Sequence, residues 1–189
     1  MTLFSTLSKR IWAPLKSTWE GETLIGDIMS IAVSVLLAWL IVNYLAQMCV
    51  VNQSSMYPTL AHGDRILVNK LAPRYRLPER GEIVVLADPR GVEKSLIKRV
   101  VGLPGDTVEI QNGLILVNGD PFPEVPTVQT ECEDQAPVTV QPGSLYVMGD
   151  NRPVSLDSRD FGPVPLTSVE GFAFARVWPL ERIGVLGQW

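Results

Sequence analysis

A serine that could act as a nucleophile, Ser55, lies just beyond a long apolar stretch of the chain. That stretch covers residues 28–51, and no Asp, Glu, Lys or Arg occurs between Asp27 and Asp64. Ser55 follows it by four residues, so even a fully extended chain keeps this serine within roughly 15 Å of its end. If the stretch spans a membrane, such a nucleophile reaches only substrates that are themselves at the membrane. The pattern therefore indicates a reaction at a membrane surface.

Hydrolysis by a serine needs a base that accepts the hydroxyl proton. His62, the only histidine, is one candidate, but it lies in a turn-like segment before a predicted strand. Lys98 is the better candidate, because in a strand it shares a face with Leu96 and Val100. Such apolar neighbours lower a lysine pKa, and a lysine base needs a value near ~8 rather than ~10.4, a change of ~3–4 kcal/mol that requires burial. The alternative is a strand lysine that reaches solvent.

A third polar segment, residues 149–162, reads GDNRPVSLDSRDFG. Its carboxylates, guanidinium groups and hydroxyls could fix a loop through internal hydrogen bonds and ion pairs. Taken alone, the segment could equally be a structural polar loop or a cation site, although its Asp spacing does not fit an EF-hand.

The apolar stretch is long enough to place these groups at a membrane. Residues 28–50 supply the ~20 apolar positions that a helix needs to cross a bilayer. The stretch exceeds the apolar region of a cleaved signal peptide, so we expect a retained transmembrane helix. Lys9, Arg10 and Lys16 precede it and no Lys or Arg follows before Arg65. The positive-inside rule then predicts a cytoplasmic N-terminus and an extracytoplasmic C-terminal domain.

Short alternating segments separated by Gly, Pro, Asn and Asp follow the span and predict strands. Asn112-Gly113 predicts a type I′ hairpin between two of them. Residues 70–80 predict a basic loop, solvated or against anionic headgroups, and residues 120–143 an irregular excursion. The fold class predicted is mainly β, with one N-terminal transmembrane helix before an antiparallel sheet. The predicted strands are Arg65–Asn69, Glu82–Ala87, Leu96–Gly102, Thr107–Gln111, Leu114–Val117, Ser144–Met148 and Gly171–Trp178.

Composition excludes several classes of protein. A net charge of −4 and a pI of about 5.0 argue against a nucleic-acid partner. A single histidine argues against a histidine-rich metal site. The spacing of Cys49 and Cys132 does not indicate a disulfide, and we expect both to be unpaired.

Three motifs, in this order after the span, resemble those of type I signal peptidases. They are SMYPTL at residues 55–60, KRVVGLPGD at 98–106, and GDNR at 149–152 followed by Ser155, DSR at 157–159 and Gly162. The resemblance runs from about residue 25 to 178. It implies a Ser/Lys serine protease without a metal or cofactor, whose antiparallel β-sheet catalytic domain is of the signal-peptidase type.

The resemblance also implies residue roles. Ser55 would be the nucleophile and Lys98 the general base that later protonates the leaving amine. Ser155 would orient the lysine, while Asp157 and Arg159 would support the site as an ion pair.

Other positions resemble the oxyanion hole and the substrate pockets of the family. The main-chain N–H of Ser55 would be one oxyanion donor. Gln53 stands where some members have a serine that gives the second donor. Its amide could serve instead, or the site could use the backbone donor alone. Met56, Leu60 and Ile97 match positions near shallow apolar pockets, which select small residues at positions −1 and −3 of the substrate by size. Pro153-Val154 replaces the Asp-Asn common in the family, which changes the surroundings of Ser155.

The expected organisation is a cytoplasmic segment (1–27), a transmembrane helix (28–50) and an extracytoplasmic catalytic domain (51–189). The enzyme would be a single-pass, monomeric protein of the bacterial inner membrane, in contact with lipid, that removes signal peptides from exported preproteins. One alternative is a specialised relative that matures a single substrate, such as a conjugative pilin. Another is a catalytically idle, membrane-anchored β-domain scaffold, against which the joint presence of Ser55, Lys98 and Ser155 argues.

Overall fold

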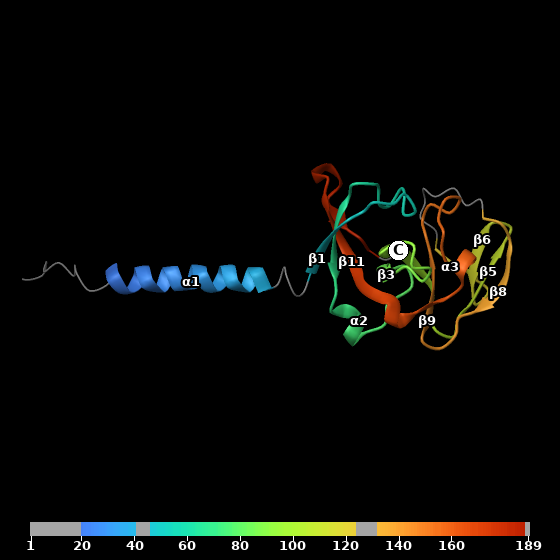
Figure 1. Cartoon of the computed structure of the whole chain (residues 1–189), viewed down its shortest axis with the longest axis horizontal. Coiled ribbons are helices and arrows are strands. Elements are labelled where there is room, and N and C mark those ends of the chain that lie inside the picture. Colours follow the sequence, from blue (N-terminus) through green and yellow to red (C-terminus); the bar gives the residue numbers. More distant parts are fainter. Residues whose placement is uncertain (1–19, 41–45, 124–131, 188–189) are drawn as a thin grey trace, which may run out of the picture. The chain divides into compact units, whose positions relative to one another are not determined.

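The computed structural model describes residues 20–40, 46–123 and 132–187. The chain divides into two units, Met1–Ile41 and Val42–Trp189. Helix α1, Glu20–Leu40, belongs to the first unit (Figure 1). Its large apolar side chains whose exposure is described, such as Ile28 and Trp39, are at least 50 % exposed. Within the described ranges, no helix combines the length and the apolar character needed to cross a membrane.

The predicted helix over 28–50 is wrong at its C-terminal end. Helix α1 ends at Leu40, and Ala46–Val50 form strand β1, which pairs antiparallel with β2 (Arg65–Asn69). Burial alternates here, since Met48 and Val50 are more than half exposed whereas Val51 is 1 % exposed. A continuous apolar run does not by itself distinguish helix from strand, and the pairing with β2 satisfies the backbone of this segment as a strand. The β-rich unit therefore includes residues before 51, the predicted boundary.

Two antiparallel sheets make up the second unit, and every strand pair is antiparallel. The larger sheet has eight strands in the order β1-β2-β11-β3-β4-β9-β10, with β12 paired to β11. The smaller has four in the order β7-β6-β5-β8, and β5, β6 and β8 group together in Figure 1. The mainly-β antiparallel prediction is confirmed.

The observed bounds of the predicted strands are close to those expected from the sequence. The larger sheet further contains β3 (Ile83–Ala87), β4 (Ser95–Gly102), β9 (Ser144–Met148), β10 (Val164–Pro165), β11 (Val169–Trp178) and β12 (Gly184–Val185). The smaller contains β5 (Thr107–Gln111), β6 (Leu114–Val117), β7 (Asp120–Pro121) and β8 (Gln135–Thr139). Short helices are α2 (Ala72–Tyr75), α3 (Ser158–Phe161), Leu166–Ser168 and Leu180–Arg182.

Two predictions about loops had different outcomes. Asn112 and Gly113 both have positive φ, 51° and 77°, and join β5 to β6 with Gln111 opposite Leu114, which confirms the type I′ hairpin. The irregular excursion over 120–143 is wrong where β7 and β8 form, because β8 pairs with β5. The predictions on residues 1–19, 41–45 and 124–131 lie outside the described residues.

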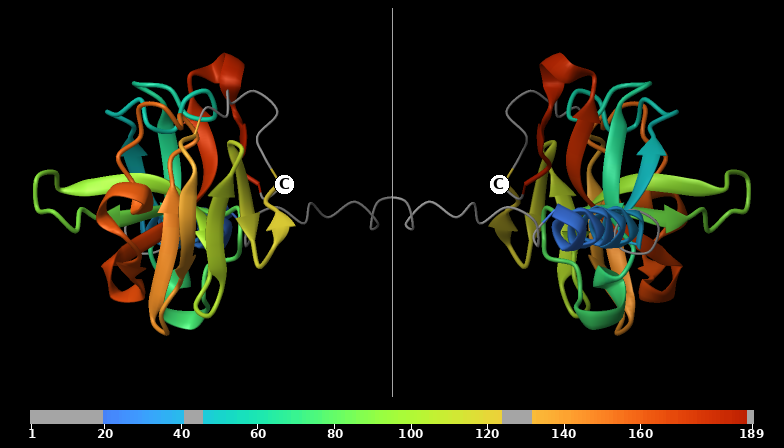
Figure 2. Two further views of the ribbon diagram at one scale, coloured as in Figure 1. Left: turned by 90° about the vertical axis from the view of Figure 1, so that its right-hand side faces the viewer. Right: turned by 90° about the vertical axis from the view of Figure 1, so that its left-hand side faces the viewer.

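Buried apolar side chains on both faces of the larger sheet position the strands that matter for the site. One cluster joins Met56 and Leu60 to Ile66, Val68, Ile83 and Val85. A second joins Leu96 and Val100 to residues of β3, β9 and β11. The loop after β1 and strand β4 are therefore anchored in core on opposite faces. The hairpin of β3 and β4 projects from the unit, light green in Figure 2.

Candidate active site

Ser55 lies in the loop between β1 and β2 and is 8 % exposed. Buried Met56 and Leu60 anchor this loop, which closes on itself through a hydrogen bond from the Leu60 amide to the Met56 oxygen (2.8 Å). The segment after β9 holds it from the other side. The main-chain N–H of Asn151 donates to the main-chain oxygen of Ser55 (2.9 Å), and Thr59 Oγ1 donates to Asp150 Oδ2 (2.6 Å).

Asp150 links the serine loop to β4. It forms a buried ion pair with Arg99, whose Nε lies 2.8 Å from Asp150 Oδ1, and both side chains are at most 1 % exposed. Because Arg99 and Lys98 are adjacent on β4, their side chains leave opposite faces of the strand. The ion pair therefore fixes the strand that carries the lysine against the loop that carries the serine.

Lys98 is 1 % exposed, so it is not a strand lysine that reaches solvent. Its Nζ donates a hydrogen bond to Ser155 Oγ over 3.0 Å. Burial lowers the pKa of Lys98 to about 8, with the positive charges of Arg90 and Arg159 acting in the same direction and the carboxylates of Asp157 and Glu93 opposing them. A substantial fraction of this amine is therefore neutral near pH 8 and able to accept a proton.

Asp157 and Arg159 hold the segment that carries Ser155. Arg159 Nε lies 2.9 Å from Asp157 Oδ1, and Arg159 Nη2 also donates to the main-chain oxygens of Arg152 (2.8 Å) and Ser155 (3.1 Å). Asp157 Oδ2 accepts from the Gly149 amide (2.9 Å), and its side chain caps α3. The pair thus fastens both ends of the loop behind Lys98, although neither residue lines the cavity described next.

Gly149 has a steric reason to be glycine. A Cβ at this position would lie 2.5 Å from the main-chain oxygen of Ser55 and against Oγ of Ser155. The backbone of Gly149 is thus packed directly between the serine loop and the Ser155 segment.

Ser55 and Lys98 line one cavity of about 270 Å³. Ser55 Oγ is buried there without a hydrogen-bond partner among the residues that the structure describes. Hydrogen bonds between catalytic groups often tighten only with substrate present. A hydroxyl and a partly neutral amine that share a cavity suit nucleophilic hydrolysis. The other lining residues are Asn52, Gln53, Ser54, Arg90, Glu93, Leu96, Val154 and Leu156.

A larger cavity of about 750 Å³ lies beside the first and shares Asn52, Gln53 and Glu93 with it. Its apolar lining includes Ile97, one of the expected pocket residues. Cys49, which has a free thiol as Cys132 does, also lines it. Met56 and Leu60, the other expected pocket residues, are 1 % and 0 % exposed in the core and contribute to neither of these two cavities.

The remaining candidates are placed as follows. His62 is exposed, and its Nδ1 lies 3.0 Å from the main-chain oxygen of Asn52. It lines neither cavity, so the geometry favours Lys98 as the base. In the described part of the chain, no group of three or more His, Cys, Asp or Glu side chains could hold a metal ion.

Sequence reasoning missed Arg90 and Glu93, which come from the turn between β3 and β4. The sequence Asp88-Pro89-Arg90-Gly91 signals a turn. It carries no signal that the turn's charges lie beside a serine more than 30 residues earlier.

Several known proteins are similar to this chain over most of its length. Residues 24–178 match the model of the family described as signal peptidase, peptidase S26. The chain is 37 % identical over 95 % of its length to a probable signal peptidase I-2 of Synechocystis sp., covering 82 % of that protein. It is 36 % identical over 87 % of its length to a signal peptidase I of Leptolyngbya laminosa, covering 84 % of it.

Another relative is signal peptidase I P of Bacillus subtilis subsp. natto, 35 % identical over 89 % of this chain and 96 % of that protein. Among solved structures, a signal peptidase I from Enterococcus faecalis covers 51 % of this chain and 97 % of its own, at 34 % identity and a TM-score of 0.45.

Proposed function

The chain belongs to the signal peptidase family S26, and we propose that it cleaves signal peptides from exported preproteins with Ser55 as nucleophile and Lys98 as general base. The observation that carries this mechanism is the shared cavity. It brings a buried serine hydroxyl that has no partner among the described residues together with a buried lysine whose pKa is lowered to about 8.

The reaction follows from these groups. Ser55 Oγ attacks the carbonyl carbon of the scissile bond while neutral Lys98 takes the hydroxyl proton. The tetrahedral oxyanion accepts hydrogen bonds from the Ser55 N–H and from the second N–H of the Gln53 side-chain amide, whose first N–H donates to Glu93. When the C–N bond breaks, the Lys98 ammonium gives its proton to the leaving amine and an acyl-Ser55 ester remains. Lys98 then takes a proton from a water that attacks the ester carbonyl carbon, and it returns this proton to Ser55 Oγ as the acyl C–Oγ bond breaks and the fragment leaves with a new carboxyl group.

Supporting groups keep the lysine in position. The Ser155 hydroxyl accepts from Lys98 Nζ, so the lone pair of the neutral amine has a fixed orientation. The Asp157–Arg159 pair fastens the Ser155 segment through main-chain oxygens. Small apolar pockets would select small side chains at −1 and −3 by size. Ile97 supports this for the larger cavity, whereas Met56 and Leu60 would act from beneath the surface.

We also propose that the protein acts at the outer face of a bacterial inner membrane as a single-pass monomer with a cytoplasmic N-terminus. Support comes from the exposed apolar side chains of α1, from the lack of charged residues between Asp27 and Asp64, and from the Lys and Arg residues before α1. Carbonate extraction and protease accessibility of tagged ends in cells test this. Release from membranes by carbonate would contradict the anchoring.

The catalytic proposal is tested with the detergent-solubilised full chain and a preprotein that has an Ala-x-Ala site. Wild type should cleave, while Ser55→Ala and Lys98→Ala should not. Thr139→Ala and Arg74→Ala, which remove a hydroxyl and a cation from exposed positions that line neither cavity, are controls and should remain active. Activity of Ser55→Ala would refute the mechanism, and a folded, inactive wild type would favour the scaffold alternative.

A further inference from the structure

The turn between β3 and β4 is built around one carboxylate. The side chain of Asp88 is fully buried. It accepts hydrogen bonds from the Arg90 amide, from Arg90 Nε and Nη2, and from the Glu93 amide, all at 3.0 Å. The guanidinium of Arg90 is therefore already paired, and the main chain of Glu93 is fixed at the edge of the cavities.

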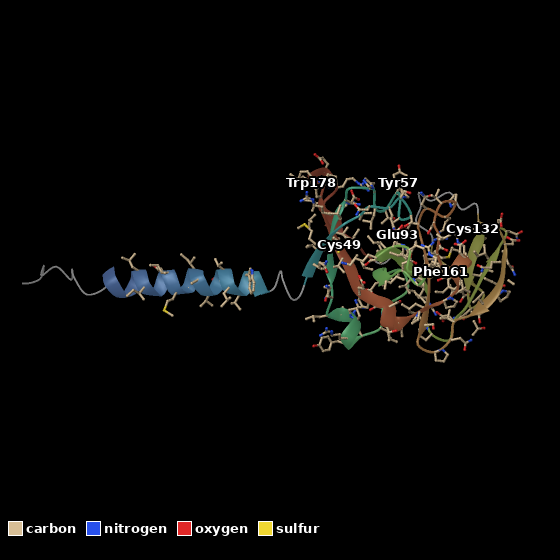
Figure 3. The ribbon with its side chains drawn as sticks, viewed as in Figure 1. Cys49, Tyr57, Glu93, Cys132, Phe161 and Trp178 are labelled. Carbon is tan, nitrogen blue, oxygen red and sulfur yellow. The ribbon has the colours of Figure 1, made fainter. Side chains whose placement is uncertain are left out.

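The carboxylate of Glu93, in contrast, is exposed and has no ion-pair partner among the residues that the structure describes. Its side-chain contact there is with the neutral amide of Gln53, whose Nε2 donates to Oε2. Lys94, the neighbouring cation, lines only the larger cavity. The carboxylate of Glu93 thus lies at the rim of the cavities without a cation paired to it among the described residues. Figure 3 labels Glu93 and Cys49, which both line the larger cavity.

Glu93 also lies between two places where a substrate would bind. The smaller cavity holds Ser55 and Lys98, and the larger one holds Ile97, Cys49 and other apolar groups; Glu93 lines both. An extended peptide whose −1 and −3 side chains enter these cavities directs its −2 side chain the opposite way, toward the rim. The −2 residue lies between the two cavities, so its side chain leaves the surface beside the exposed carboxylate of Glu93, which lines both.

We propose that Glu93 is a specificity-determining residue that favours a cationic side chain, Lys or Arg, at substrate position −2 and disfavours an acidic one. This rests on the proposed function, because substrate position −2 is defined relative to the bond that Ser55 is proposed to attack. A −2 lysine displaces the Gln53 amide and pairs with the carboxylate, while a −2 glutamate is repelled by it. For an exposed pair at this rim, we expect a preference of about two- to fivefold.

The test uses the detergent-solubilised full chain and fluorogenic peptides with Ala at −3 and −1 that differ only at −2, as Lys, Gln or Glu. In wild type, kcat/KM should fall in the order Lys, Gln, Glu, and 1 M salt should shrink the differences. Glu93→Gln should make the three peptides nearly equal, and Glu93→Lys should reverse the order. Glu109→Gln, which removes the same charge on β5 away from both cavities, should keep the wild-type order.

The outcomes distinguish the role of Glu93 from the proposed function. Equal cleavage of the three peptides by wild type, or the wild-type order in Glu93→Lys, would overturn the role of Glu93 while Ser55-dependent cleavage still supports the proposed function. If no peptide is cleaved in a Ser55-dependent way, the proposed function fails and the role of Glu93 fails with it.

Discussion

Replacing Lys98 by methionine should stabilise the protein near neutral pH while it abolishes catalysis. The pKa of Lys98 is lowered from 10.5 to about 8 because burial disfavours the ammonium form. This difference means that the folded state holds the charged lysine at a cost of about 3 kcal/mol below pH 8. Methionine fills a similar volume without the charge, but it leaves Ser155 Oγ without its 3.0 Å partner, a loss of about 1 kcal/mol or more. We therefore expect Lys98→Met to raise the free energy of unfolding by about 1–2 kcal/mol at pH 7.

The free energy of unfolding should also depend on pH through Lys98. Between pH 8 and 10.5 the unfolded wild type binds more protons at Lys98 than the folded protein does, so the contribution of this group to stability rises with pH. Lys98→Met lacks that rise, and its advantage should shrink toward pH 10.5. The assay is urea unfolding of the full chain in detergent, followed by tryptophan fluorescence from pH 7 to 10.5.

Lys94→Met is the matched control. Lys94 is exposed, so its replacement should change the free energy of unfolding by less than about 0.5 kcal/mol at either pH. The reasoning would be refuted if Lys98→Met were less stable than wild type at pH 7 and followed the same pH dependence.

Three further predictions concern activity. Because only the neutral amine of Lys98 accepts a proton, kcat/KM should rise about fivefold from pH 7 to 8 and about tenfold from pH 7 to 9, and a rate that falls over this range in a pH profile would argue against a lysine base. Gln53→Ala should lower kcat about tenfold or more with little change in KM, because it removes the proposed side-chain donor to the oxyanion, and an unchanged kcat would remove Gln53 from the oxyanion hole. Gly149→Ala should displace Ser55 or Ser155, lowering kcat and destabilising the fold by about 1–3 kcal/mol; full activity with unchanged unfolding would contradict this packing.

The strands that were predicted correctly carry strong local signals. The hairpin of β5 and β6 follows from two alternating segments around Asn112-Gly113, because both turn residues tolerate positive φ. Strand β8 was missed because Pro137 breaks the pattern, yet it is an edge strand, where a missing N–H is tolerated. Strand β1 was missed because its residues continue an apolar run, and only pairing with β2 separates them from α1.

Some residues of the site could likewise be predicted from local sequence and others could not. Lys98 could be found from sequence because strand alternation places it among Leu96 and Val100, and both of these side chains are buried. Glu93 could not be found, because it reaches the serine loop through a turn whose shape depends on buried Asp88. The contact between positions 53 and 93 joins a loop to a turn that are distant in the sequence, and a single sequence carries no record of it.

The most direct test of the central claim is to trap the acyl-enzyme. Wild type mixed with an Ala-x-Ala preprotein at pH 8 is quenched with acid within the first turnover, digested, and analysed by mass spectrometry. We predict that the signal-peptide fragment is attached as an ester to Ser55, and that Ser55→Ala carries no adduct. Continued cleavage without an adduct at Ser55, or an adduct on Ser54 instead, would contradict the account.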